Sequence, residues 1–250
     1  ITHLLDGKVD LALATNGEGG YKYSTLGEFI YNEELDTEAE GREKLPGIRK
    51  MELMKGGNIV GIRNYYFFEQ VDNAFDTDIS VAFDTWDVAW VRSRIKELIQ
   101  KNKYNYVFTM LPTKETHGHH KAVAILAMQA AKQIDESKRP VVLATTIYSK
   151  NAESKYEYKG LNGFEISEPL EDVKPLEFDR TQKFGFDQRL NYKIIGNWVI
   201  AEHKSQGTMQ MYMSRGDVEQ YWYLKMNGEE NYSKAKQLFE AVNEAEIYDK

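Results

Sequence analysis

The sequence predicts an α/β protein with a doubly wound, three-layer Rossmann-like fold and a mostly parallel sheet. Strand-like apolar runs alternate with helical stretches as far as about residue 147, which is the pattern of consecutive βαβ units. The run VVLATTI at 141–147 is rich in β-branched residues, as expected of a parallel strand covered on both faces. No internal repeat or clean linker interrupts the 250 residues, so we expect a single domain over residues 1–250.

The N-terminal half begins with Ile1, Leu4 and Leu5 at helical spacing, and we expect Asp6-Gly7 to end this short helix, with Gly7 in the stop position. Four elements then follow. They are a buried strand at 9–14, an irregular aromatic-rich loop at 21–35, a helix at 38–58 that Pro46 could kink, and a strand at 64–69.

The middle of the chain carries the clearest periodicity. After an aspartate-rich loop at 70–85, Val88, Val91, Ile95, Leu98 and Ile99 form one face of an amphipathic helix at 87–102. A strand at 104–111, a second helix at 116–135 and the strand at 141–147 complete this half. Beyond residue 150 the pattern weakens, and we expect an edge strand at 164–166 and helices at 187–202 and 232–243.

A helix that runs into a strand through a two-residue turn is the second half of a βαβ unit. The strand that would begin this unit is absent before Ile1. We therefore expect the given chain to be a processed or truncated form whose first strand lies upstream. The alternative is a native protein that begins with a short helix.

Composition narrows the function classes. With 42% hydrophobic and 28% charged residues the chain is an ordinary globular protein, and its net charge of −7 with dispersed basic residues argues against a nucleic-acid partner. No apolar run approaches the length of a membrane span. The absence of cysteine excludes disulfides, thiolate metal sites and cysteine nucleophiles, but it leaves cytoplasm and periplasm equally open. Nothing in the sequence indicates an oligomeric state.

A glycine-rich turn, TNGEGG at 15–20, follows the strand at 9–14. The carboxyl ends of strands in open α/β sheets are where ligands bind, so this turn is a candidate binding loop. Glu18 would repel a phosphate, and the turn lacks the GxGxxG spacing, so a phosphate cradle is not expected.

Three of the five histidines, His117, His119 and His120, fall within four positions where a predicted strand gives way to a predicted helix. His117 and His120 are three apart, so both side chains can point the same way, and a helix N-terminus disfavours imidazolium and so keeps imidazole neutral for a metal. Surface histidines that cap a helix are the alternative, although Thr116 is available as the cap. A catalytic zinc needs three protein ligands, so a further ligand must come from elsewhere.

These segments together resemble the LmbE-like (PIG-L) family of metal-dependent N-acetylglucosamine de-N-acetylases. Four stretches carry the likeness in the family's order: TNGEGG at 15–20, Arg49-x-x-Glu52-Leu53 with the Val-Gly-Ile that follows at 60–62, THGHH at 116–120, and HKSQ at 203–206. Each stretch alone is weakly specific, whereas the set is fairly specific.

The resemblance implies roles for particular residues. His120 would bind the metal, a single divalent ion expected to be zinc, and His117 would support the tetrahedral intermediate. Glu18, Arg49, His119 and His203 would line the substrate site. Each has a structural alternative: Glu18 could simply close its turn, Arg49 could be a solvated or ion-paired helix residue, and His203 could make structural hydrogen bonds.

One large departure from the family remains, because no H-P-D-D-E motif, which would supply two metal ligands and the general base, occurs in this sequence. It would lie about 10–25 residues before Ile1, on the strand expected there, given typical βα connections. The implied activity is zinc-dependent hydrolysis of an acetyl group from an N-acetylated sugar or glycoconjugate. The alternatives are an inactive carbohydrate-binding or scaffold relative, or another metallohydrolase such as an esterase.

Overall fold

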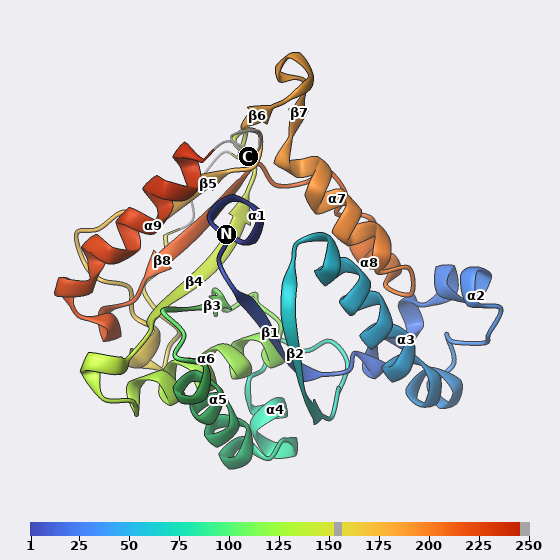
Figure 1. Cartoon of the computed structure of the whole chain (residues 1–250). Coiled ribbons are helices and arrows are strands. Elements are labelled where there is room, and N and C mark those ends of the chain that lie inside the picture. Colours follow the sequence, from blue (N-terminus) through green and yellow to red (C-terminus); the bar gives the residue numbers. More distant parts are fainter. Residues whose placement is uncertain (153–156, 246–250) are drawn as a thin grey trace. The chain divides into compact units, whose positions relative to one another are not determined.

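The computed structural model of the chain describes residues 1–152 and 157–245, which form two compact units (Figure 1). Unit 1 comprises residues 1–75 and 180–215 together with the described end of the chain, and unit 2 comprises residues 76–179 and 216–243. Both units combine helices with strands, which confirms the mixed α/β class. The doubly wound arrangement and the single domain stay predictions.

Unit 1 is built on a parallel βαβ unit. Strand β1 (Val9–Thr15) pairs with β2 (Ile62–Gln70), and the long helix α3 (Glu38–Ile59) connects them. Pro46 lies inside α3, which runs as one helix from Glu38 to Ile59. The short α1 (Thr2–Leu5) precedes β1, and Asp6 rather than Gly7 takes the left-handed conformation at its end, with φ of 51°.

The loop expected at 21–35 contains helices instead. A 3₁₀ helix η1 (Glu18–Tyr23) leads into α2 (Thr25–Tyr31). Gly27 is buried in α2, and a Cβ at this position would lie 3.0 Å from the Ser205 Cα. Packing against a distant segment therefore holds α2 in place, and the local sequence carries little sign of this contact.

The second part of unit 1 starts with the short strands β6 (Lys183–Phe184) and β7 (Leu190–Asn191), which flank the 3₁₀ helix η4 (Phe186–Gln188). Helix α7 (Tyr192–Glu202) follows, and then α8 (Gly207–Gln210). The helix expected from residue 187 thus starts only at Tyr192, because the Asn191 side chain caps it by accepting a hydrogen bond from the Lys193 amide.

Unit 2 contains a four-stranded sheet in the order β3-β4-β8-β5, formed by Tyr106–Met110, Val141–Tyr148, Val218–Tyr223 and Leu176–Asp179. Strands β3 and β4 are parallel, as the sequence predicts. Strand β8 runs antiparallel to both β4 and β5, so the C-terminal part of the chain extends the sheet in the opposite sense.

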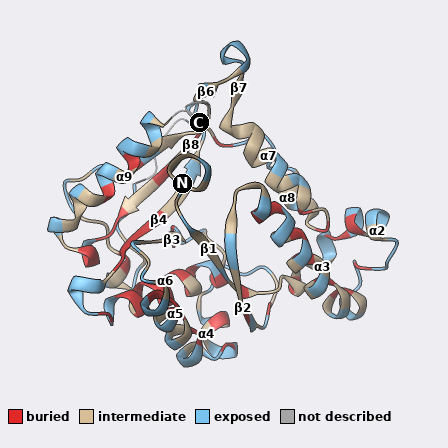
Figure 2. Cartoon of the chain, in the orientation of Figure 1, coloured by how far each residue is buried: buried red, intermediate tan, exposed pale blue. Residues whose placement is uncertain are grey.

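Helices cover the two faces of this sheet. Val141 and Leu143 point to the face where α9 (Tyr232–Glu244) contributes Ala235 and Phe239 to the core. Helix α6 (Gly118–Lys132), which packs on β3 and β4, is the most extensively buried helix of the unit (Figure 2). Helices α5 (Val88–Asn102) and α4 (Ser80–Thr85) pack in turn on α6.

The edge strand expected at 164–166 is instead the 3₁₀ helix η3 (Glu165–Ser167). The Ser167 hydroxyl donates a hydrogen bond to the Phe164 carbonyl at 2.7 Å and accepts one from the Leu161 amide at 2.8 Å, so the backbone folds back on itself. The other 3₁₀ turns of the unit are η2 (Glu136–Lys138), η5 (Lys225–Asn227) and η6 (Glu229–Asn231). Within the described ranges, no helix has both the length and the apolar character needed to cross a bilayer.

Candidate functional site

The histidine cluster lies where β3 gives way to α6, at the carboxyl end of a parallel strand. The Leu111 amide donates to the Thr145 carbonyl at 2.7 Å, which ties the start of the connecting loop to β4. The Thr116 hydroxyl donates to the Leu111 carbonyl at 2.8 Å and accepts from the Thr113 amide at 3.1 Å. Thr116 therefore closes this loop, and the expectation that it could cap α6 is wrong.

His117 is the N-cap of α6. Its backbone is non-helical, with φ of −50° and ψ of 137°, and its Nδ1 accepts a hydrogen bond from the His119 amide at 3.0 Å. An Nδ1 that accepts must carry a lone pair, so the neutral ring has its proton on Nε2. The helix end thus selects the tautomer in which Nε2 is a hydrogen-bond donor.

The three imidazoles lie close together but in different environments. The ring of His117 lies 4.6 Å from that of His119 and 5.4 Å from that of His120, measured between centroids. His119 is buried against Trp86, with 5.2 Å between ring centroids, whereas His120 is exposed and His117 half-buried. The solvent-facing members of the cluster are therefore His117 and His120.

The aspartate-rich segment before α4 contacts the same helix end. The Gly118 amide donates to the Asp76 carbonyl at 2.7 Å, and a Cβ on Gly118 would lie only 2.2 Å from the Asp78 carbonyl oxygen. Only glycine allows this approach. The Asp78 carboxylate accepts from the Ser80 amide at 2.9 Å, and this bond lowers the pKa of Asp78.

Lys121 is a residue of this region that the sequence analysis missed. It is buried, and its Nζ donates to the Lys114 carbonyl at 3.0 Å, which links α6 to the loop before the histidines. Burial lowers the pKa of its ammonium group. Its position one residue after His120 on an otherwise apolar buried face was the available sequence signal.

We asked whether the side chains present can coordinate a divalent metal ion. In the described ranges 1–152 and 157–245, no three His, Cys, Asp or Glu side chains are arranged to hold an ion. The histidine cluster offers an exposed imidazole at His120 but no complete ligand set. These residues alone therefore do not fit a catalytic zinc.

The remaining predicted site residues belong to unit 1. Glu18 begins η1 after the left-handed Gly17 of the glycine-rich turn. Its Oε1 accepts from the Asp72 amide at 3.0 Å. Its Oε2 is buried and has no hydrogen-bond partner among the described residues, which marks it as an acceptor open to a donor group of a ligand.

Arg49 is buried in α3, and its guanidinium donates to oxygens of the protein itself. NH1 donates to the Gly17 carbonyl, NH2 to the Gly20 carbonyl at 3.1 Å and the Ser24 hydroxyl at 3.2 Å, and Nε to the Ser205 hydroxyl at 3.3 Å. Burial lowers the pKa of Arg49. These contacts show a structural role in holding the glycine-rich turn. A role in substrate binding stays a prediction.

Two motifs meet at this arginine. Glu52, one helical turn after Arg49, is fully buried and accepts from the Ser205 amide and hydroxyl, each at 2.7 Å, and from the Tyr31 hydroxyl at 2.9 Å. Burial and this carboxylate raise the pKa of Tyr31. The HKSQ segment therefore contributes Ser205, which the sequence analysis quoted within its motif but did not single out.

His203 is buried at the end of α7. Its Nδ1 lies 2.8 Å from the Val199 carbonyl, and its Cε1 lies 3.1 Å from where a Cβ of Gly56 in α3 would be. The ring thus packs α7 against α3. Its predicted place in the substrate site, like that of His119, remains a prediction, since the two histidines belong to different units.

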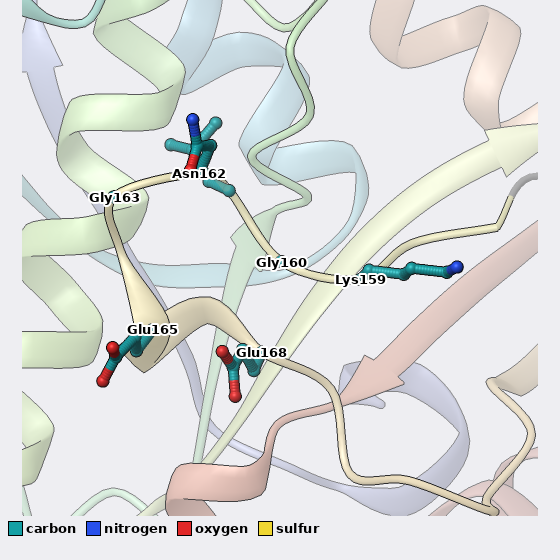
Figure 3. Close-up of a pocket in the computed structure, with 7 residues that line it drawn as sticks. Lys159, Gly160, Asn162, Gly163, Glu165 and Glu168 are labelled. Atoms are coloured by element: carbon teal, nitrogen blue, oxygen red, sulfur yellow. The ribbon is translucent and has the colours of Figure 1, made fainter.

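A separate hollow on unit 2 is lined by the loop at 159–168 (Figure 3). The carboxylates of Glu165 and Glu168 and the amide of Asn162 border it, and none of the predicted site residues is part of its lining. This hollow is therefore not the site that the histidine cluster indicates.

Comparison with known proteins addresses the identity of the chain. The chain is 28% identical over 134 residues to a probable N-acetyl-α-D-glucosaminyl L-malate deacetylase 2 of Bacillus cereus, which corresponds to 54% of this chain and 56% of the relative. The chain thus spans little more than half the length of this curated relative.

Solved structures of similar shape are more distant. N,N'-diacetylchitobiose deacetylase of Pyrococcus horikoshii matches with a TM-score of 0.47 and 14% identity, over 86% of this chain and 72% of that one. The 4-carboxy-2-hydroxymuconate hydratase GalB of Pseudomonas putida matches with a TM-score of 0.46 and 13% identity, over 86% and 95% of the two chains. At these values neither structure carries an argument about function.

The family match is more decisive. The model of PIG-L, described as GlcNAc-PI de-N-acetylase, matches residues 2–131, a range that begins in α1 and ends in α6. It includes the glycine-rich turn, Arg49, Glu52 and the whole histidine cluster. The chain therefore belongs to the PIG-L family.

Proposed function

We propose that this chain takes part in de-N-acetylation of a sugar of the N-acetylglucosamine type. The observation that carries the proposal is His117, a helix N-cap within the range that the family model matches, whose Nδ1 acceptor bond leaves a proton on Nε2. The similar Bacillus cereus protein, named as a glucosaminyl malate deacetylase, supports the substrate class.

The reaction breaks the amide C–N bond. A water oxygen adds to the acetyl carbon, the carbonyl oxygen becomes an oxyanion, and the tetrahedral intermediate then expels the amine. We assign the Nε2–H of His117 to the oxyanion, since a donor placed where negative charge develops lowers the barrier. The attacking water supplies the proton that the leaving nitrogen takes up, so that acetate and a free amino sugar result, while His117 keeps its Nε2 proton and acts as a hydrogen-bond donor.

Glu18 is the best supported of the proposed substrate-binding residues. Its Oε2 is a buried acceptor without a partner among the described residues, which suits a sugar hydroxyl as donor. Arg49, His119 and His203 are kept as proposed lining residues, although the observed contacts of Arg49 and His203 are structural.

The proposal also concerns a metal ion and the residue that would bind it. The resemblance implies one divalent ion, zinc, with His120 as the residue of this chain that would bind it. The donors of the described residues do not complete such a site, so we assign no step through a metal.

The alternative is that the chain is a non-catalytic carbohydrate-binding relative. Acetate release from N-acetylglucosamine and from N-acetylglucosaminyl malate, followed with and without added zinc, separates the two. Release that depends on His117 supports the enzyme. Saturable sugar binding without acetate release, in protein supplied with zinc, would favour the alternative.

A further inference from the structure

We propose that Asn162 is a site of spontaneous covalent modification, at which the side-chain amide is converted to a carboxylate. Asn162 and Gly163 form an Asn-Gly pair in the loop that lines the hollow of unit 2 (Figure 3). The reaction needs only water as a reagent, and the proposal does not depend on the proposed function.

The modification begins with an attack of the backbone on the side chain. The Gly163 nitrogen adds to the Asn162 Cγ, the C–N bond of the side-chain amide breaks, and ammonia leaves with the proton of the attacking nitrogen. Water then opens the resulting cyclic succinimide at either carbonyl, which gives aspartate or isoaspartate. Water is thus consumed and ammonia released. Glycine favours this reaction, because no side chain shields its nitrogen and its backbone rotates freely.

The Asn-Gly pair lies at the centre of a tight turn. The Phe164 amide donates to the Leu161 carbonyl at 2.9 Å, and Gly163 has φ of 82°, the left-handed conformation that a type II turn requires of its third residue. The hydrogen bond joins only the outer residues of the turn, so the peptide between Asn162 and Gly163 takes no part in it. Figure 3 shows the pair at the bend of the loop.

Both reacting groups have the freedom to meet. Asn162 and Gly163 are exposed, and within residues 1–152 and 157–245 neither makes a hydrogen bond. A Cβ on Gly163 would meet no atom within 4 Å, so the space around this residue is open. Rotation of the Asn162 backbone toward the attacking geometry therefore has to break at most the hydrogen bond between Leu161 and Phe164.

The chain contains two further Asn-Gly pairs, and the fold protects both. Asn227 is buried, and its side chain accepts from the Val142 amide and donates to the Val142 carbonyl, each at 2.8 Å. The Gly228 amide, which would be the nucleophile, donates to the Lys225 carbonyl at 3.2 Å. An attack at Asn227 would therefore have to break all three hydrogen bonds.

Asn16 and Gly17 are protected by contacts of unit 1. The Asn16 side-chain amide donates to the Glu69 carboxylate at 2.5 Å. The Gly17 carbonyl accepts from Arg49, and a Cβ on Gly17 would lie 3.0 Å from the Arg49 Cδ. The backbone cannot turn toward the side chain without displacing this buried arginine. Of the three pairs, all of which the structure describes, the one in the loop of unit 2 is thus the least restrained.

The modification changes both the charge and the backbone of the loop. It adds a carboxylate to a hollow that Glu165 and Glu168 already border, in a chain whose net charge is −7. Isoaspartate also inserts an additional backbone carbon between Leu161 and Phe164, which alters the geometry of the turn. The hollow of an aged molecule therefore differs in charge and in shape from that of a newly made one.

The test is incubation of the 250-residue chain at mildly alkaline pH in water labelled with heavy oxygen, followed by proteolysis and mass spectrometry. The label enters at ring opening, so it distinguishes the reaction from earlier deamidation. We expect the peptide of Asn162 to react roughly tenfold faster or more than those of Asn16 and Asn227, which must first open locally. Equal rates, or a slower reaction at Asn162 than at either other site, would overturn the proposal.

An unfolded control separates the effect of the fold from that of the local sequence. In guanidinium chloride the three Asn-Gly pairs should react at rates within about threefold of one another, because the contacts that protect two of them are lost. If Asn162 kept its full advantage in the unfolded chain, the fold would not be what selects it, and the proposal would be overturned.

A variant confirms the position of the modification. Asn162→Gln keeps a side-chain amide, but its longer side chain cannot form the succinimide with the following nitrogen. Isoaspartate is measured by methyl transfer from S-adenosylmethionine with an isoaspartyl methyltransferase. Incubated wild type should accept methyl groups, and incubated Asn162→Gln should accept far fewer. Equal methylation of the two proteins would place the modification at another residue and overturn the proposal.

Discussion

The Ser205 hydroxyl donates a hydrogen bond of 2.7 Å to the carboxylate of Glu52, which lies 153 positions earlier in the chain. The same hydroxyl accepts from Nε of Arg49, so one small side chain joins two motifs that the sequence places far apart. Through Arg49 the network extends to the carbonyls of Gly17 and Gly20 in the glycine-rich turn. The conformation of the candidate binding loop therefore depends on a buried network in which Ser205 links Arg49 to Glu52.

Removing a member of this network should destabilise the fold. Ser205→Ala deprives the buried Glu52 of a hydrogen bond, which should lower the free energy of unfolding by about 1.5–3 kcal/mol. Arg49→Ala leaves the carbonyls of Gly17 and Gly20 and the Ser24 hydroxyl without their donor, and should cost at least as much. Urea denaturation measures both. Thr25→Ala, whose exposed hydroxyl makes a 3.3 Å contact to Asp36, should change stability by less than about 0.5 kcal/mol. Equal losses of unfolding free energy in Ser205→Ala and Thr25→Ala would show that the network does not stabilise the fold.

Two glycine substitutions should change the stability of the fold in opposite directions. Gly118→Ala places a Cβ 2.2 Å from the Asp78 carbonyl oxygen, so it should destabilise by about 1–3 kcal/mol as the backbone shifts. Gly47→Ala, at an exposed position in α3 with no atom within 4 Å of the new Cβ, should stabilise by about 0.5–1 kcal/mol. Thermal unfolding of both variants checks the pair. A stable Gly118→Ala protein would show that the Asp76–Asp78 segment does not hold the start of α6.

His117 combines a structural task with the proposed catalytic one, and substitutions can separate them. His117→Ala removes the N-cap and should cost about 1 kcal/mol, whereas His117→Asn keeps a capping side chain and should be nearly neutral. In active protein both should lose roughly 10²–10³-fold in kcat with little change in KM, because the oxyanion donor acts in the transition state. An active His117→Asn variant would reduce His117 to a helix cap.

The decrease in unfolding free energy at acidic pH should depend on Asp78. Its pKa in the folded state lies below the ordinary value of 3.8, because the Ser80 amide donates to its carboxylate. A lowered carboxyl pKa stabilises the fold above the unfolded value, and this contribution is lost as pH falls through the folded pKa. Asp78→Asn keeps an acceptor but cannot titrate, so its unfolding free energy should fall less between about pH 5 and about pH 2. Denaturation curves of identical pH dependence would contradict the assignment.

Metal content tests the proposed role of His120. After dialysis the 250-residue chain should retain well under one zinc per molecule, because a single imidazole does not hold zinc against water. Elemental analysis measures this directly, and His120→Ala should lower any residual zinc further. One tightly held zinc per chain would mean that the ligands have been misplaced.

Local patterning was sufficient for much of the fold. The periodicity of Val91, Ile95 and Leu98 predicts α5, because the buried face of a helix requires apolar residues at helical spacing. The β-branched run at 141–147 predicts β4. The family also followed from the sequence, since the motifs at 15–20, 49–53 and 116–120 all lie within the matched residues 2–131.

Other features required the tertiary structure. That β8 joins the sheet antiparallel to β4, and that α2 forms in an expected loop, depends on partners distant in sequence, which no local period encodes. The same holds for the site: the sequence placed His117 at a helix start, but hydrogen bonds from Thr116 to Leu111 and from the His119 amide to His117 decided that His117 is the cap. Long-range hydrogen bonds likewise show that Arg49 holds the glycine-rich turn, because its donors meet oxygens from segments up to 156 positions away. Its role in substrate binding stays a prediction.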